Sequence, residues 1–410
     1  MMTFSDKLRS NDQPKRLAVK LNATGEQYVL KGHPWVFSKA IKKINKGGHA
    51  GDLAIIFGGK SNGMVGIGLY DPESPIRIKI LYHGNDPVVI NKDFFRRKIE
   101  DAFEKRKPLL KTNTNSYRLI FGENDGLPGF IADVYANVLV VKLYSEIWLP
   151  YLEIMIPGLQ EITDCQTIVL RLSRQLLQSD SHHFVDGEVI YGALENEVVK
   201  FVEHGVNFSA HVIKGHKTGY FLDHRANRKQ VGGWSRGKTV LDVFSYAGGF
   251  SVHALAGGAK EVTSLDISKQ ALDIAYKNGK LNDYSGTHEL IAGDAFEALK
   301  KLIKDQKTFD VVVIDPPSFA KQTSEITLAK KKYAKLAELG EKLTAKNGLL
   351  VLASCSSRVT AQAFFDINKE QLRQGHRKYH LILQTGHDVD HPVSFSEGAY
   401  LKCGYYRFKD

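Results

Sequence analysis

The stretch "LDVFSYAGGFSVHALAGGAKEVTSLDIS", residues 241–268, decides the fold of the C-terminal half of the chain. A short apolar segment leads into the glycine pair Gly248 and Gly249, a helix-length segment follows, and a second β-type segment ends at Asp266. Strand, helix and strand in this order predict a βαβ unit with parallel strands. Because ligands of open parallel sheets bind beyond the carboxyl ends of the strands, we expect Gly248 and Asp266 to face a ligand.

The alternation of strand and helix continues to the C-terminus. The segments with strand character are residues 239–244, 261–266, 288–294, 309–315, 348–354, 380–385 and 400–408. Helical patterns fit between them, whereas residues 386–399, before the last strand, have none. A long hairpin with an antiparallel final strand is the simplest fit to that gap. From about residue 203 the chain therefore predicts a Rossmann-like, doubly wound α/β sheet of seven strands.

The N-terminal half shows two other patterns. Between residues 15 and 83, short β segments broken by glycine predict a small β barrel. An amphipathic helix at about 92–107 and a hairpin at 129–144 predict a middle α+β domain. We therefore expect three domains, which are a barrel at 1–84, an α+β domain at 85–202 and the large sheet at 203–410.

Composition and charge restrict the class of protein. No apolar run reaches the roughly 20 residues that span a bilayer, and the N-terminus lacks a secretory signal, so we expect a cytoplasmic protein without a membrane partner. The net charge is +11, and residues 1–50 alone carry ten Lys or Arg against three acidic residues. Such a basic end favours a polyanion, although solubility alone also explains it. The three widely spaced cysteines predict neither a disulfide framework nor a zinc site.

The glycine loop favours a nucleoside ligand. Its sequence, "SYAGGF" at 245–250, does not have the G-x-G-x-x-G spacing that a pyrophosphate needs, and S-adenosylmethionine carries no phosphate. Asp266 follows Gly248 by 18 residues and suits a ribose diol, and Asp294 ends the third strand. A glycine pair alone could merely allow close packing, but the two acids together with it predict a nucleoside site.

The fourth and fifth strands end in chemically active groups. The fourth runs into "DPPSF", residues 315–319, where two prolines stiffen the loop, remove two backbone donors and leave carbonyls for a base edge. Phe319 is available for stacking. The fifth ends at Ser354, which places Cys355 at the same rim as Asp315. A lone cysteine is usually an inert buried residue, as we expect for Cys165 and Cys403, but this position indicates a nucleophile.

With these residues assembled, the chain resembles RNA (cytosine-5) methyltransferases that carry an N-terminal PUA domain. Within them it is most similar to the bacterial group that acts on 23S ribosomal RNA of the large subunit. The similar motifs occur in the family's order over nearly the whole chain: "KGHPWVFSKAI" (31–41), "FGENDGLPGFIADVY" (121–135), "GHKTGYFLDHRANR" (215–228), "DVFSYAGGFSVHAL" (242–255), "DPPSF", "SCSS" (354–357) and "DHPV" with "EGAYLK" (390–402).

The resemblance implies S-adenosylmethionine as cofactor, ribosomal RNA as partner and a role for each matching residue. The residues implied at the cofactor are Tyr220, Phe221, Asp223, Arg225, Phe244, Ser245, Gly248, Asp266, Asp294, Asp315 and Pro316. Those implied near RNA are Lys31, His33, Trp35 and Phe319. Asp315 and Cys355 are implied as catalytic, Cys355 being the nucleophile. No metal is expected, and the sequence neither indicates nor excludes an oligomer.

The chemistry of cytosine C5 asks for such a set, because C5 is a poor nucleophile until a thiolate adds at C6. An acid near N3, here Asp315, would stabilise the developing charge. Some relatives have a second cysteine in the loop where this chain has Pro-Pro-Ser, so the residue that removes the C5 proton is not assigned. Two alternatives stay open: N-methylation of a guanine or adenine without a thiol, and a catalytically silent RNA-binding assembly factor.

Overall fold

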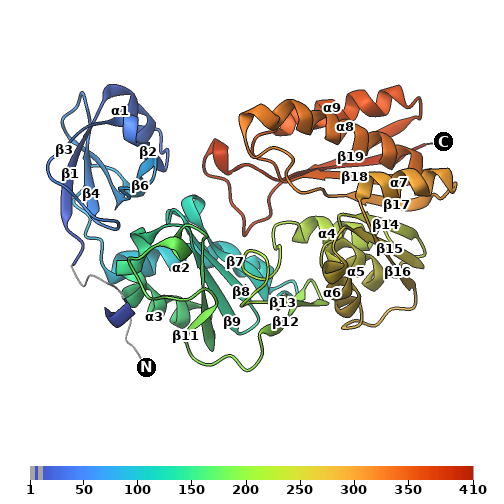
Figure 1. Ribbon diagram of the computed structural model, residues 1–410, viewed down its shortest axis with the longest axis horizontal. Helices are drawn as coiled ribbons and strands as arrows, with labels where there is room; N and C mark the ends of the chain where they lie inside the picture. Colours follow the sequence, from blue (N-terminus) through green and yellow to red (C-terminus); the bar gives the residue numbers. More distant parts are fainter. Residues whose placement is uncertain (1–4, 8–12, 410) are drawn as a thin grey trace. The chain divides into compact units, whose positions relative to one another are not determined.

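The computed structural model describes residues 5–7 and 13–409 and divides into two compact units (Figure 1). Arg9 and Asp12 of the basic N-terminal stretch lie outside the described residues. Unit 1 consists of residues 1–201, 210–221 and 389–396, and unit 2 of residues 202–209, 222–388 and 397–410. The boundary passes through the hairpin β12 (Val198–Glu203) and β13 (Val206–His211).

The first sheet of unit 1 has six strands. They are β1 (Arg16–Leu21), β2 (Trp35–Phe37), β3 (Ile41–Ile44), β4 (Leu53–Phe57), β5 (Met64–Tyr70) and β6 (Ile76–His83), hydrogen-bonded in the order β2-β6-β5-β4-β1-β3. Alternate residues of β1 (Leu17, Val19 and Leu21) are buried, so this strand turns one face to the core and the other to solvent. The short helix α1 (Ala23–Leu30) begins after Asn22, whose side chain accepts a hydrogen bond from the Gly25 N–H.

The second sheet of unit 1 has five strands in the order β11-β10-β9-β8-β7. They are β7 (Ser116–Phe121), β8 (Phe130–Tyr135), β9 (Val138–Leu143), β10 (Thr167–Leu172) and β11 (Glu188–Tyr191). Two helices, α2 (Lys92–Leu110) and α3 (Leu152–Thr163), share one apolar core with this sheet. The predicted hairpin is confirmed, since β8 and β9 pair antiparallel. The 3₁₀ helices of the chain are η1 (Ser5–Lys7), η2 (Ser38–Ala40), η3 (Gly122–Asp125), η4 (Glu146–Tyr151), η5 (Leu176–Gln178), η6 (Thr323–Glu325) and η7 (Ser396–Gly398).

Unit 2 is built on a seven-stranded sheet in the order β16-β15-β14-β17-β18-β20-β19. The strands are β14 (Thr239–Val243), β15 (Glu261–Asp266), β16 (Thr287–Ala292), β17 (Phe309–Ile314), β18 (Thr344–Ser354), β19 (Tyr379–Thr385) and β20 (Lys402–Phe408). The helices are α4 (Arg225–Gly233), α5 (Gly249–Ala256), α6 (Lys269–Gly279), α7 (Ala295–Lys304), α8 (Ile326–Leu343) and α9 (Ala361–Gln374). Strand β20 runs antiparallel to both of its neighbours, which confirms the predicted sheet and its final hairpin.

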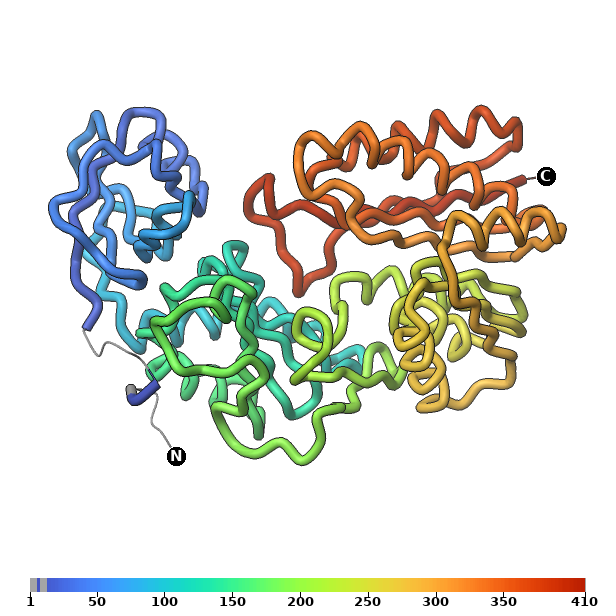
Figure 2. The backbone as a smooth tube through the Cα atoms, in the orientation of Figure 1, coloured from blue at the N-terminus to red at the C-terminus, as the bar shows by residue number. Residues whose placement is uncertain are grey.

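Apolar residues on both faces of the strands explain the two helical layers of unit 2 (Figure 2). On β17, Val312 and Ile314 belong to the cluster that contains residues of α7, α8 and α9, whereas Val311 and Val313 belong to the cluster with residues of α4 and α5. Strands covered on both faces are typical of a doubly wound sheet. The strand order reverses between β14 and β17, the position at which such sheets bind ligands.

A buried ionic cluster fixes α4 and α5 in unit 2. The carboxylate of Glu203, which is fully buried, accepts two hydrogen bonds of 2.7 Å from Arg228, and lies 2.9 Å from His253 Nε2. The charge of Arg228 and the hydrogen bond from His253 outweigh the effect of burial and hold the pKa of Glu203 below its usual range.

In the described ranges, no helix is both long and apolar enough to cross a membrane.

Candidate active site

The loop that follows β14, at the carboxyl edge of the sheet of unit 2, has a strained backbone. Phe244 and Tyr246 both have a positive φ, 65° and 48°, a region that costs non-glycine residues of order 1–3 kcal/mol each. Gly248 follows with φ 78°, and a Cβ there would lie 2.7 Å from Cβ of Ala275. Glycine is therefore required at position 248, where the backbone enters α5.

Asp266 is held at the end of β15 by the strained loop and by its own turn. Its Oδ2 accepts from the Tyr246 N–H and its Oδ1 from the Ser268 N–H, each at 2.9 Å. A carboxylate has about four lone-pair sites, so capacity remains for the two hydroxyls of a ribose. The next residue, Ile267, is 76% exposed and offers an apolar surface for a flat ring. Asp294 is exposed and caps α7 through the Glu297 N–H.

Ser245 and Asp223 supply polar groups beside this loop. The Oγ atom of Ser245 is buried and has no hydrogen-bond partner in the described part of the chain, so it can bond to a ligand or to a water. Asp223 accepts a 2.9 Å hydrogen bond from the Tyr400 hydroxyl. Arg225 is fully buried and pairs with Asp388 at 3.1 Å. An orphan hydroxyl, a ribose-type carboxylate and an exposed apolar residue fit a nucleoside cofactor.

Two expected cofactor residues belong to the other unit. Tyr220 and Phe221 are in unit 1, where the Tyr220 carbonyl accepts from the Tyr135 hydroxyl at 3.1 Å. The Tyr220 ring also packs edge-on against Phe201. The expected role of both residues at the cofactor stays a prediction.

The loop after β17 carries the Asp315 carboxylate and the Pro316 carbonyl. The Asp315 Oδ1 atom lies 3.3 Å from the Nε2 atom of His224, a buried residue at the start of α4. The carbonyl of Pro316 lies 3.9 Å from the Cys355 Sγ atom, at the distance of a weak S–H···O contact. Phe319 packs against Tyr333 at 5.2 Å, and the ammonium of Lys332 lies 5.0 Å from the Phe319 ring centre.

Cys355 follows β18 directly and is partly exposed. Burial, and then the negative charges of Asp315 and Asp223, raise the pKa of its thiol to about 12, while the positive charge of Lys402 opposes them. Cys165 and Cys403, in contrast, are buried as predicted. Cys355 is therefore partly exposed to solvent, and its thiol is protonated in the free protein.

Lys402 holds the segment that follows Cys355. It pairs with Ser354 across β18 and β20, and its buried ammonium donates to the carbonyls of Ser356, Val359 (2.6 Å) and Tyr400 (3.1 Å). Burial lowers the pKa of Lys402 to about 8. Three carbonyl acceptors satisfy the three donors of the ammonium and fix the turn that presents the thiol.

Comparison with known protein families identifies the family of the chain and the cofactor of this site. Residues 118–382 match the S-adenosylmethionine-dependent methyltransferase family, and residues 19–83 match the PUA-like domain. The chain belongs to the S-adenosylmethionine-dependent methyltransferases. Its cofactor is S-adenosylmethionine, as the sequence predicts, and its barrel is the predicted PUA-like domain.

Curated relatives of the methyltransferase match along almost its full length. A "Ribosomal RNA large subunit methyltransferase" of Deinococcus radiodurans is 39% identical over 95% of this chain and 96% of its own. A "Ribosomal RNA large subunit methyltransferase I" of Aeromonas salmonicida is 34% identical over 92% of this chain and 96% of its own.

Solved structures share the fold of the methyltransferase. A candidate SAM-dependent methyltransferase from Streptococcus mutans has a TM-score of 0.80 at 21% identity and covers 95% of this chain and 99% of its own. A candidate methyltransferase solved in complex with SAH has a TM-score of 0.79 at 22% identity, over 96% of this chain and 100% of its own.

Three of the four residues expected near RNA, which are Lys31, His33 and Trp35, lie on the PUA-like part of the methyltransferase, and Phe319 lies in the loop after β17. Lys31 is exposed and ends α1, and His33 and Trp35 form edge-to-face contacts with one another at 5.7 Å. The Trp35 ring also contacts Phe395, and its Nε1 atom donates to Glu123 at 3.0 Å. Trp35 is thus half-buried and anchored by one edge.

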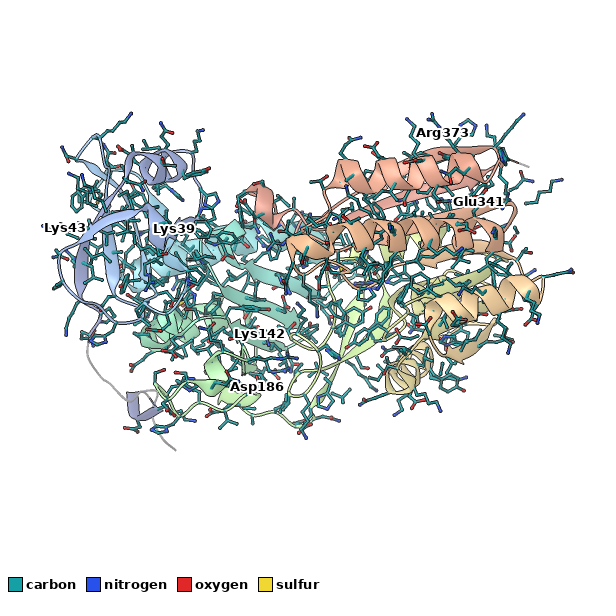
Figure 3. The ribbon with its side chains drawn as sticks, turned by 45° about the horizontal axis from the view of Figure 1, so that its top comes forward. Lys39, Lys43, Lys142, Asp186, Glu341 and Arg373 are labelled. Atoms are coloured by element: carbon teal, nitrogen blue, oxygen red, sulfur yellow. The ribbon has the colours of Figure 1, made fainter. Side chains whose placement is uncertain are left out.

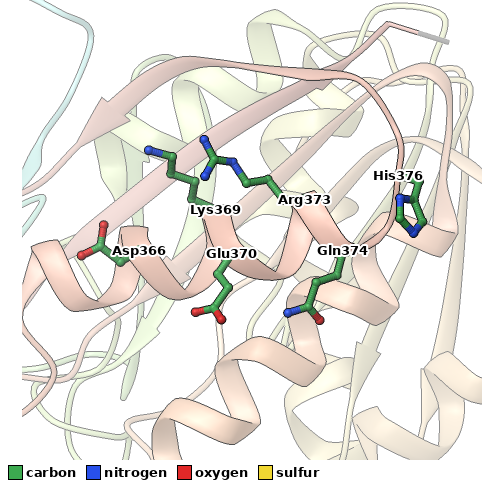
Figure 4. A pocket seen from close by; sticks show the side chains of 6 residues that line it. All are labelled: Asp366, Lys369, Glu370, Arg373, Gln374 and His376. Atoms are coloured by element: carbon green, nitrogen blue, oxygen red, sulfur yellow. The ribbon is translucent and has the colours of Figure 1, made fainter.

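His224 and Lys402 are the residues of the methyltransferase site that the sequence did not single out. Both lie inside quoted motifs, and His224 directly follows Asp223, which was an available signal. Lys402 is distant from Cys355 in the sequence, and only the pairing of β18 with β20 brings it near. A hollow along α9 contains none of the predicted site residues. Figure 4 shows the charged and polar side chains that line it, which extend from that helix and the turn after it: Asp366, Lys369, Glu370, Arg373, Gln374 and His376.

Proposed function

We propose that this methyltransferase methylates C5 of a cytosine in large-subunit ribosomal RNA and that Cys355 is the nucleophile. The names of its relatives support the RNA, and the PUA-like barrel supports RNA binding. One observation carries the proposal for cytosine C5. The thiol of Cys355 lies 3.9 Å from the carbonyl in the loop that begins with Asp315, so nucleophile and acid share one rim.

S-adenosylmethionine supplies an electrophilic methyl group. Asp266 and Asp294 would hold its nucleoside, and Phe244, Ser245 and Gly248 would lie beneath it. Asp223, Arg225 and Pro316, with Tyr220 and Phe221, are proposed at its methionine end and reactive centre. The strained loop supports this role, because strain of this kind collects at ligand-binding positions.

In this proposal, the proton that the Cys355 thiol loses is the one that Asp315 passes to the base. Asp315 can donate to the base N3 only when protonated, and a protonated Asp315 no longer carries the charge that raises the pKa of the Cys355 thiol. The thiol proton therefore passes to Asp315 and N3 as the Sγ–C6 bond forms. After methyl transfer, the C5 proton passes to a base that is not assigned, the Sγ–C6 bond breaks, and the proton on N3 returns through Asp315 to the Cys355 thiolate.

The PUA-like barrel is proposed to hold the RNA through charge and aromatic surface. Lys31, with His33 and Trp35, forms the predicted contact, and Lys39 and Lys43 add exposed positive charge on the same barrel (Figure 3). Phe319 is the proposed stacking partner of the target base. Each phosphate neutralised by a lysine adds to the salt dependence of binding.

The test is the identity of the methylated nucleoside. Large-subunit RNA is incubated with S-adenosylmethionine and either the wild-type protein or Cys355→Ala, digested and analysed by mass spectrometry. The proposal predicts 5-methylcytidine with the wild type and none with the variant. A methylated guanosine or adenosine that both proteins produce would contradict it, and no product with intact S-adenosylmethionine binding would indicate an RNA-binding factor.

A further inference from the structure

His224 is placed to act on Asp315 and not on solvent. Its side chain is 4% exposed, and its Nε2 atom lies 3.3 Å from Asp315 Oδ1 without an aligned hydrogen bond in the described residues. The ring of Phe250 lies 5.5 Å from the imidazole and packs beside it. A buried nitrogen this close to a carboxylate at the rim of a candidate site is positioned for a contact that tightens in the working complex.

The other nitrogen of His224 fixes which tautomer the ring adopts. The Nδ1 atom lies 3.0 Å from the amide nitrogen of Asn227, which can only donate, so Nδ1 accepts. The orientation of this amide is set in turn, because its Oδ1 accepts from Thr385 Oγ1 at 2.6 Å and from the Tyr405 hydroxyl at 2.8 Å. With Nδ1 as acceptor, the ring proton lies on Nε2 and faces Asp315.

The charges around the imidazole favour its protonated form. Burial opposes a charge on His224, but Asp315 and then Asp223 outweigh burial and the charge of Arg228, and raise the pKa of His224 above 6.5. The Asp315 charge thus attracts the proton-bearing Nε2 atom of His224.

We propose that His224, held by Asn227, is a positioning residue whose Nε2–H orients Asp315. This inference rests on the proposed function, because it explains how the Asp315 carboxyl is held toward the base. The proton stays on Nε2, so the thiol proton remains the one that Asp315 passes to N3. The titration of a buried histidine with a merely structural role would not depend on Asp315.

The first experiment needs no reaction. Histidine nitrogen chemical shifts of the full-length protein are followed by NMR against pH, with His224→Gln to assign the signal and Asp315→Asn to remove its partner. We expect an Nε2–H tautomer with a midpoint above 6.5 that falls in Asp315→Asn. An Nδ1–H tautomer, or a midpoint that does not depend on Asp315, would overturn the inference even if methylation proceeds as proposed.

The second experiment measures the reaction with His224→Leu, which removes the N–H donor, and with His224→Gln, which keeps one. Exposed His380→Gln on β19 is the matched control and should behave as the wild type. For His224→Leu we expect kcat to fall about tenfold to a hundredfold, because Asp315 loses its orientation, and for His224→Gln we expect a smaller fall. KM for RNA and affinity for S-adenosylmethionine should stay within about threefold in both variants.

An unchanged kcat in His224→Leu would contradict the inference, and so would loss of S-adenosylmethionine binding in both variants, since that assigns His224 to folding or cofactor binding alone. A wild-type protein that forms no 5-methylcytidine would refute the proposed function, and the NMR titration would still decide the link between His224 and Asp315.

Discussion

Asp315→Asn should make the Cys355 thiol of the free protein more reactive, because it removes the largest charge that opposes the thiolate. The pKa of this thiol rises from 9.0 to about 12, first by burial and then through Asp315 and Asp223. At 1.36 kcal/mol for each pKa unit, that difference is about 4 kcal/mol against the thiolate. Burial is unchanged by the substitution, so the thiol of the variant should stay less acidic than an ordinary one.

The size of the effect follows from two opposing terms. At pH 8 a thiol of pKa about 12 has roughly a thousandfold less thiolate than one of pKa 9.0. A thiolate of higher pKa is also the stronger nucleophile toward disulfides, which recovers a factor of about 15–30. Wild-type Cys355 should therefore react about 30–60 times more slowly than an ordinary thiol, and each pKa unit that Asp315→Asn removes should raise the rate about three- to fourfold.

The assay follows reaction with a small neutral disulfide from pH 7 to 10.5, and Cys355→Ala supplies the background from the other two cysteines. The pH profile separates charge from access, because steric hindrance lowers the rate equally at every pH. The wild-type rate should still rise at pH 10.5. A wild-type rate that levels off near pH 9, or a profile that Asp315→Asn leaves unchanged, would refute the electrostatic reasoning.

Three further substitutions test other parts of the account. Glu203→Ala removes the carboxylate that pairs with the buried guanidinium of Arg228 and should lower the free energy of unfolding by about 3–5 kcal/mol in urea titrations, against less than about 1 kcal/mol for the surface control Glu338→Ala. Burial raises the pKa of Asp242 from 3.8 to about 7, so the folded state binds the Asp242 proton more tightly than the unfolded state does. The stability that this proton contributes is lost as the pH rises from about 4 through 7. Asp242→Asn should therefore show a smaller fall in melting temperature over this range. Lys31→Ala should weaken RNA binding for all sequences and reduce the slope of log affinity against log salt by about 1, whereas Lys346→Ala should not.

The sequence predicted those residues of the candidate site that lie at the carboxyl ends of strands. Asp266, Asp315 and Cys355 each follow a short apolar strand, and parallel strands bring their carboxyl ends to one edge. The positive φ of Phe244 and Tyr246 could not be predicted in the same way, because bulky residues disfavour that region and only the surrounding packing enforces it.

Contacts between distant segments were also out of reach of the sequence pattern. Asn227 orients His224 because Thr385 and Tyr405, more than 150 residues away, donate to its carbonyl oxygen. The segment 389–396 belongs to unit 1 although it joins two strands of unit 2, and no periodicity indicates this. The bounds of the three domains expected from the sequence pattern stay predictions.

The covalent role of Cys355 is the central claim, and one adduct tests it most directly. The protein and S-adenosylmethionine are incubated with large-subunit RNA that carries 5-fluorocytidine, whose fluorine cannot leave as the C5 proton does, and the products are resolved under denaturing conditions. The account predicts a denaturant-stable protein–RNA adduct with the wild type and none with Cys355→Ala. No adduct with an active wild-type protein, or an adduct that persists in Cys355→Ala, would contradict it.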